Sequence, residues 1–179
     1  HIFLFFSRLL KSKGILEFLE AAKILRSKKI KAKFLVAGPI LKKDRDAISL
    51  NEIRNWHQSQ YIEYKGEIKD VREILDISSC VVLPTYYNEG VPRVLLEAGA
   101  FSLPLIASNS RGCRDVLKDG FNGLFCPTKD SIGLSDTMLK LFNMSDRKIE
   151  EMGINSRKMI EENFDEKVVI QKYLNLLPH

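Results

Sequence analysis

The segment CVVLPTYYNEGVPRVLLEA, residues 80–98, carries the pattern that decides the fold. It begins with a continuous apolar run, Cys80–Leu83, which Pro84 ends, and it leads into an apolar helical stretch at residues 91–101. A short apolar run without alternating polar residues is typical of a strand buried on both faces. The segment therefore predicts a buried strand, a loop and a helix in succession.

The same succession recurs along the whole chain. Further strand-like runs lie at residues 2–6, 32–37, 61–64, 105–107 and 123–125, and helical stretches lie at 14–28, 50–59 and 71–77. Regular alternation of such strands and helices is typical of a parallel sheet covered by helices on both faces. The sequence therefore predicts an α/β protein: one doubly wound, Rossmann-like domain spanning residues 1–179.

The composition narrows the class of protein. A chain of 179 residues with 45% hydrophobic residues is long enough for one domain with its own core. Its net charge of +5 favours an anionic partner, which leaves nucleic acid, an anionic membrane surface and a phosphorylated small molecule open. No apolar run approaches the roughly 20 residues that cross a bilayer, so no transmembrane helix is expected.

The cysteines and the first residue add two expectations. Cys80, Cys113 and Cys126 form no CxxC motif, so the sequence predicts neither a disulfide framework nor a zinc site. Free cysteines indicate a reducing compartment. The chain begins at His1 rather than at a methionine, and we expect it to be a part of a longer protein.

The first candidate site is the loop SRLLKSKG, residues 7–14, which follows the first predicted strand. Ligands of doubly wound sheets bind at the carboxyl ends of the strands. Arg8, Lys11 and Lys13 would lie at that edge, where Arg offers bidentate hydrogen bonds and Lys a mobile charge to a diphosphate. The loop lacks the glycines of a Walker or GxGxxG motif, and an ordinary solvated loop fits the same residues.

The second candidate site is the loop and helix that carry Glu89 and Glu97, eight positions apart. Gly90 allows a close approach of the backbone to a ligand, and Pro92 suits the first turn of a helix. The first amides of the helix and its dipole favour an anion there. Two readings stay open: a site for an extended polar ligand, or a helix start in which Glu89 caps the helix and Glu97 is exposed.

These motifs resemble those of a known family, the C-terminal, donor-binding domain of GT-B retaining glycosyltransferases of family 4. Glu89 and Glu97 match its E-x7-E pattern, and Arg8 and Lys13 match the Arg and Lys that follow its first strand. Segments similar to the family continue in the same order to the end of the chain: LVAGP, YKGEIKDVREIL, LPLIASNSRGCRDVLKDGFNGLFCP and NFDEKVVIQKYL. The likeness is greatest to bacterial enzymes that build capsule, O-antigen or lipid-linked oligosaccharides.

The resemblance implies a reaction and three catalytic residues. Arg8 and Lys13 would stabilise the leaving nucleoside diphosphate, so no metal or other cofactor is expected, and Glu89 would contact the donor sugar. The donor would be a nucleotide diphosphate sugar, UDP-linked, with an N-acetylhexosamine as one candidate sugar. The acceptor would be a polysaccharide or lipid-linked saccharide held by an N-terminal domain that is absent here, in the cytoplasm at the inner face of the membrane.

The resemblance also implies residues that bind the donor. Glu97 would bind the ribose hydroxyls, and the amides of Gly90 and Val91 would contact the sugar. The helix start at Val94 would bind the phosphate, and the backbone of Gly66 and Ile68 would lie against the base. Pro92 removes one amide near the phosphate, and Arg93, Arg111 and Arg114 fit either donor contact or solvent. A non-catalytic domain that binds a phosphorylated metabolite is the alternative function. A nucleic-acid-binding module is less favoured, because the cations are dispersed and no basic-aromatic motif accompanies them.

Overall fold

The computed structural model describes residues 1–41, 43–88 and 90–175. Within these residues the chain forms one six-stranded sheet, in which every pairing is parallel and the strand order is β3-β2-β1-β4-β5-β6. This is the order of the dinucleotide-binding Rossmann sheet. The strands are β1 (Ile2–Phe6), β2 (Lys33–Ala37), β3 (Glu63–Tyr64), β4 (Cys80–Leu83), β5 (Leu105–Ser108) and β6 (Gly123–Cys126).

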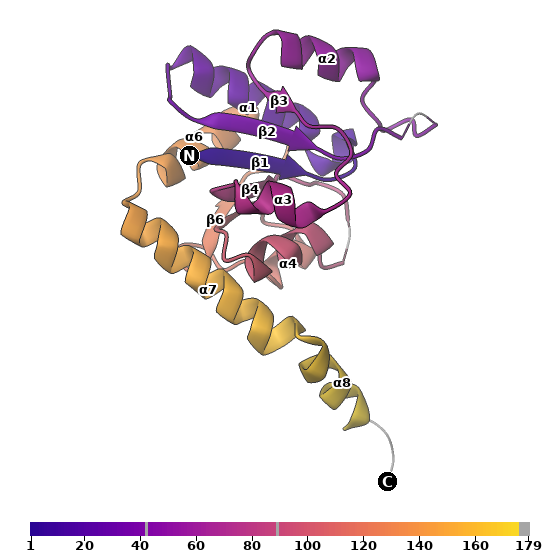
Figure 1. Cartoon of the computed structure of the whole chain (residues 1–179), viewed down its shortest axis with the longest axis vertical. Helices are drawn as coiled ribbons and strands as arrows, with labels where there is room; N and C mark the ends of the chain where they lie inside the picture. Colours follow the sequence, from indigo (N-terminus) through magenta and orange to yellow (C-terminus); the bar gives the residue numbers. More distant parts are fainter. Residues whose placement is uncertain (42, 89, 176–179) are drawn as a thin grey trace.

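Helices cover both faces of this sheet (Figure 1). They are α1 (Ile15–Ser27), α2 (Leu50–Gln58), α3 (Val71–Asp76), α4 (Arg93–Ala100), α5 (Arg111–Arg114), α6 (Ser131–Phe142), α7 (Asp146–Phe164) and α8 (Glu166–Leu174), with a short 3-10 turn, η1 (Lys11–Lys13), before α1. The helix α8 extends the chain away from the sheet (Figure 1). No helix in the described part of the chain is long and apolar enough to cross a membrane.

The core has two halves, one on each face of the sheet. Phe3 and Phe5 of β1 pack with α1, α2 and α6 on one face. Leu4, between them in sequence, packs with α3 and α4 on the other face. Successive residues of a strand point to opposite faces, so a strand covered on both sides must be apolar at every position. This is why the continuous apolar runs of the sequence predicted the strands.

Two predicted elements differ from the structure by more than one residue at an end. The strand predicted at 61–64 is reduced to Glu63–Tyr64, because only these two residues pair with β2 at the edge of the sheet. The helix predicted at 91–101 begins at Arg93. Pro92 lies just before it with ψ of 118°, an extended conformation, so its placement in the first helical turn is wrong.

All three cysteines are buried. Burial raises the pKa of the Cys126 thiol to about 12, and burial also raises the pKa of the Cys80 thiol. A thiol is nucleophilic only as its thiolate. Cys113, in α5, is likewise fully buried in the core.

Candidate functional site

The strand order places the predicted ligand edge between β1 and β4. β1 pairs with β2 on one side and with β4 on the other, so the order of the chain reverses here. Ligands of doubly wound sheets bind at such a reversal. A hollow of about 480 Å³ lies at this point, lined by Phe6, Ser7, Arg8, Lys13, Leu83, Pro92, Arg93, Val94 and Glu97.

The structure brings four predicted site residues together around this hollow. Arg8 and Lys13 come from the segment after β1, whereas Val94 and Glu97 come from α4, some 80 positions later. Phe6 and Leu83, the last residues of β1 and β4, add apolar surface that the search for charged residues did not select. The hollow thus combines three cations, which are Arg8, Lys13 and Arg93, with a carboxylate and the start of a helix, while the binding roles of these residues stay predictions.

Other predicted residues lie outside the hollow. Gly66 follows β3, where its carbonyl accepts a hydrogen bond from the Gly38 N–H at 2.8 Å, and Ile68 packs against the core. Val91 also packs against the core, and Gly90 is exposed with open space around it. Among the described residues, none of these four predicted residues lines the hollow. Glu89 lies outside the described residues.

Lys13 is the deeply placed cation of the site, with only 5% of its surface exposed. Its ammonium lies over the Tyr87 ring, 5.0 Å from the ring centroid. The backbone N–H of Lys13 donates to the Leu10 carbonyl at 3.0 Å, which closes the 3-10 turn. A charge removed from water interacts more strongly with an incoming anion than an exposed charge does. Lys13 is therefore well placed to hold a phosphate.

Arg8 is an exposed cation of the site. It stands one residue after Ser7, whose N–H still donates to the Ala37 carbonyl at 3.2 Å and so continues the pairing of β1 with β2. The backbone at Arg8 is thus attached to the rigid edge of the sheet, while its guanidinium remains accessible to a ligand. A planar guanidinium can bind a phosphate through two parallel hydrogen bonds.

Glu97 is neither fully buried nor free. Its side chain is 27% exposed, and its Oε1 accepts a hydrogen bond from Arg93 Nε at 3.2 Å. Arg93 itself is 90% exposed, so this pair contributes little to stability. A carboxylate has about four acceptor positions, so Glu97 retains capacity for the hydroxyl groups of a ligand while Arg93 is bound. Arg93 also lines the hollow, whereas its contact with the donor stays a prediction.

The small residues after Glu97 serve helix packing. A Cβ added to Gly99 would lie 2.7 Å from Ile160 Cγ1, so Gly99 allows α7 to approach α4. This close packing lies on the side of α4 that faces α7.

Pro92 changes the helix start less than its missing N–H suggested. Because Pro92 precedes α4, the first two amides of the helix belong to Arg93 and Val94, and both residues line the hollow. The Leu95 N–H donates to the Pro92 carbonyl at 3.0 Å. The helix therefore begins next to the hollow with amides that Pro92 does not remove.

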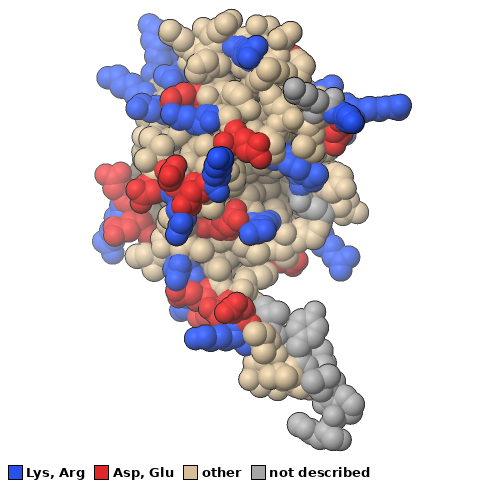
Figure 2. Space-filling view, turned by 45° about the vertical axis from the view of Figure 1, so that its right-hand side comes forward, with Lys and Arg blue, Asp and Glu red and all other residues tan. Residues whose placement is uncertain are grey.

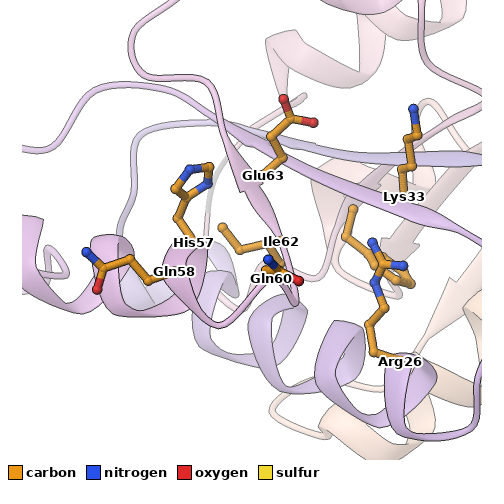
Figure 3. A pocket seen from close by; sticks show the side chains of 8 residues that line it. Arg26, Lys33, His57, Gln58, Gln60, Ile62 and Glu63 are labelled. Carbon is orange, nitrogen blue, oxygen red and sulfur yellow. The ribbon is translucent and has the colours of Figure 1, made fainter.

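A second hollow, of about 500 Å³, lies at the opposite edge of the sheet (Figure 3). Arg26 at the end of α1, Lys33 at the start of β2 and Glu63 at the start of β3 contribute to its lining. Arg26 lies over the Phe34 ring at 5.6 Å, and Glu63 accepts from Lys65 Nζ at 2.5 Å. Within the described residues, no three His, Cys, Asp or Glu side chains are grouped to hold a metal ion at either hollow.

Comparison with known proteins identifies the family. The family model described as "Glycosyl transferases group 1" matches residues 1–159. The chain belongs to the glycosyl transferases group 1. It is 30% identical over 178 residues to N,N'-diacetylbacillosaminyl-diphospho-undecaprenol alpha-1,3-N-acetylgalactosaminyltransferase of Campylobacter jejuni, an alignment that covers 98% of this chain and 44% of the relative. The chain thus spans less than half the length of this relative.

Two solved structures share the fold of this glycosyltransferase domain. HepE of Anabaena in complex with UDP superposes with a TM-score of 0.84 at 18% identity, covering 97% of this chain and 47% of that one. The C-terminal domain of the group 1 protein LpcC of Francisella tularensis superposes with a TM-score of 0.76 at 23% identity, covering 93% of this chain and 87% of that one. The predicted resemblance to C-terminal domains of GT-B enzymes and the predicted Rossmann-like sheet are confirmed.

One face of the domain carries mixed rather than uniformly basic surface charge (Figure 2). On the face shown in Figure 2, Lys and Arg side chains lie among Asp and Glu side chains. A nucleic-acid-binding surface typically gathers its cations into one patch or stripe. Family membership, together with the placement of Arg8 and Lys13 at the hollow, favours a small anionic ligand over a nucleic acid.

Proposed function

We propose that this chain is the donor-binding domain of a retaining, metal-independent glycosyltransferase of family 4. The observation that carries the proposal is the hollow between β1 and β4, which joins Arg8, Lys13 and Glu97 at the reversal of strand order. The donor is a nucleotide diphosphate sugar, with UDP as the nucleotide and an N-acetylhexosamine as the sugar. HepE, which shares the fold, was solved with UDP, and this supports the choice of nucleotide.

Each residue of the hollow has a part in this proposal. Arg8 and Lys13 bind the diphosphate and stabilise the charge that develops on it as the bond to the sugar breaks. Arg8 and Lys13 offer the electrostatic stabilisation that a metal ion gives in other transferases, which supports a metal-independent reaction. Glu97 binds the ribose hydroxyls, and the amides of α4 beginning at Arg93 and Val94 face the phosphate. From the sequence pattern, Glu89 contacts the donor sugar.

The acceptor belongs to the rest of the protein. We propose that an N-terminal domain supplies the acceptor site, and that the acceptor is a surface polysaccharide or a lipid-linked saccharide handled at the cytoplasmic face of the membrane. The Campylobacter relative supports this choice, because its name specifies an undecaprenol-linked diphosphate sugar acceptor. By itself, the 179-residue chain is expected to bind the donor without transferring the sugar.

The proposal is tested by asking whether the chain binds the nucleotide sugar without transferring the sugar. Thermal unfolding of the chain, recorded with UDP, GDP, CDP and their sugar conjugates, should show a raised midpoint for UDP and UDP-N-acetylhexosamine, because a ligand of the native state stabilises it by mass action. The same samples, analysed by chromatography, should contain intact UDP-sugar. A midpoint that responds to none of the nucleotides would contradict the proposal, and sugar transfer to a lipid acceptor by the domain alone would contradict the division between domains.

Glu97→Gln tests the ribose contact. The variant is expected to bind UDP roughly fivefold more weakly, because a hydroxyl bonds more strongly to a carboxylate than to a neutral amide. Calorimetric titration with UDP measures the change. Glu161→Gln is the matched control: Glu161 accepts from Arg157 Nε at 2.6 Å in the same i,i+4 geometry, but in α7. Equal UDP affinities of the two variants would rule out the ribose contact.

A further inference from the structure

The Lys11–Lys13 turn is held from two sides by segments that are distant in sequence. On one side, the Ser12 carbonyl accepts hydrogen bonds from the Tyr86 and Tyr87 N–H groups, at 2.9 and 3.0 Å. These tyrosines belong to the loop that leads from β4 to α4. This side therefore connects the two segments that line the hollow, but it leaves the amide and hydroxyl of Ser12 to be bound from elsewhere.

On the other side, the turn is bound by Asp46, which lies in the segment between β2 and α2. Asp46 Oδ2 accepts from the Ser12 N–H at 3.0 Å and also from the Ser12 hydroxyl. The Asp46 carbonyl accepts from the Lys11 N–H at 2.8 Å. Asp46 thus accepts three hydrogen bonds, which fix Lys11 and Ser12, the two residues before Lys13.

The negative charge of Asp46 and its hydrogen bonds are expected to affect phosphate binding in opposite directions. A carboxylate next to an anion site lowers the positive potential there and, by charge alone, weakens the binding of a phosphate. Its hydrogen bonds have the opposite effect if they hold Lys13 in the binding position, because a ligand then loses less energy in ordering the turn. Removing the charge and removing the hydrogen bonds therefore change phosphate affinity in opposite directions.

We propose that Asp46 is a positioning residue of the diphosphate site, acting through Ser12 on Lys13. Asp46 is half-buried and lies outside the lining of the hollow among the described residues, so it acts without touching the ligand. The inference rests on the proposed function, because it takes the hollow to be the diphosphate site.

Two variants of Asp46 separate its hydrogen bonds from its charge. Asp46→Ala is expected to bind UDP roughly tenfold more weakly in calorimetric titration. Asp46→Asn is expected to bind UDP at least as tightly as the parent chain, because an amide oxygen can still accept from the Ser12 N–H and the negative charge is gone. Asp76→Ala is the control: it removes one exposed carboxylate at the end of α3, away from the Lys11–Lys13 turn, and should leave the affinity unchanged.

A double-mutant cycle separates positioning from general loosening of the fold. In a Lys13→Met background, Asp46→Ala should lose its effect on UDP affinity, whereas in a Glu97→Gln background the full tenfold effect should remain. A general loss of structure would weaken UDP binding in both backgrounds.

The outcomes distinguish the inference from the proposed function. Parent-like or tighter UDP binding by Asp46→Ala, an Asp46→Asn as weak as Asp46→Ala, or an undiminished effect in the Lys13→Met background would overturn the positioning role and leave the proposed function intact. A parent chain that binds no UDP would overturn both.

Discussion

Gly14→Ala is expected to lower the free energy of unfolding by about 3 kcal/mol or more. Gly14 ends the Lys11–Lys13 turn with φ of 82°, a left-handed conformation that costs other residues roughly 1–3 kcal/mol. An added Cβ would also lie 2.4 Å from the Pro84 carbonyl oxygen and 2.6 Å from Pro84 Cγ. The side chain therefore forces apart the segments after β1 and β4. Urea unfolding, followed by circular dichroism, measures the loss.

Gly120→Ala is the matched control for this variant. Gly120 has φ of 72°, close to that of Gly14, but a Cβ added to it would meet no other atom within 4 Å. It should lose only the conformational part, about 1 kcal/mol. If both variants unfold at the same urea concentration, contact with Pro84 contributes nothing and the close approach of the two segments is not required for stability.

Lys13→Met is expected to weaken the binding of UDP by roughly 10- to 100-fold, since charge-assisted hydrogen bonds contribute about 1.5–3 kcal/mol. Methionine is apolar and of similar length, so it can fill the buried space of Lys13 without its charge. Arg8→Met should show a smaller loss, because Arg8 is exposed and its interaction with an anion is screened by salt. Calorimetric titration at two salt concentrations measures both losses.

Lys11→Met is the control for Lys13→Met within the same turn. Lys11 carries the same charge two positions earlier, and it is absent from the described lining of the hollow. Its replacement should change UDP affinity less than about threefold, the effect of one nearby charge in water. Equal losses for Lys11→Met and Lys13→Met would mean that the net charge of the turn attracts UDP and that Lys13 makes no specific contact.

The sequence predicted most of the fold because a strand buried on both faces is apolar at every position, a pattern that is easily found in a sequence. Cys80–Leu83 is apolar at every position, and each of its residues is buried. The pattern fails where burial is incomplete. β3 lies at the edge of the sheet, its two residues are not fully buried, and its predicted length was therefore too great.

The sequence predicted which candidate residues come together better than it predicted their supporting contacts. The rule that ligands bind at the carboxyl ends of the strands selected Arg8 and Lys13, and the E-x7-E pattern selected Glu97. The structure has all three around one hollow. Neither the rule nor the pattern indicated Asp46 or Tyr87 as neighbours of the Lys11–Lys13 turn. Ser12 and Asp46 are 34 positions apart, and their contact depends on the path of an irregular loop that no periodicity describes.

The central strand pairing also determines when the hollow can form during folding. The Ile2 N–H donates to Ser79 Oγ across 77 positions of the chain, at the start of the β1–β4 pairing. Closing so long a loop costs chain entropy before its contacts form, which makes such pairing slow. A partly folded chain has the cations and the carboxylate but lacks the hollow that joins them. A nucleotide that binds there, as proposed, is therefore expected to slow the unfolding of the finished domain and not to accelerate its folding.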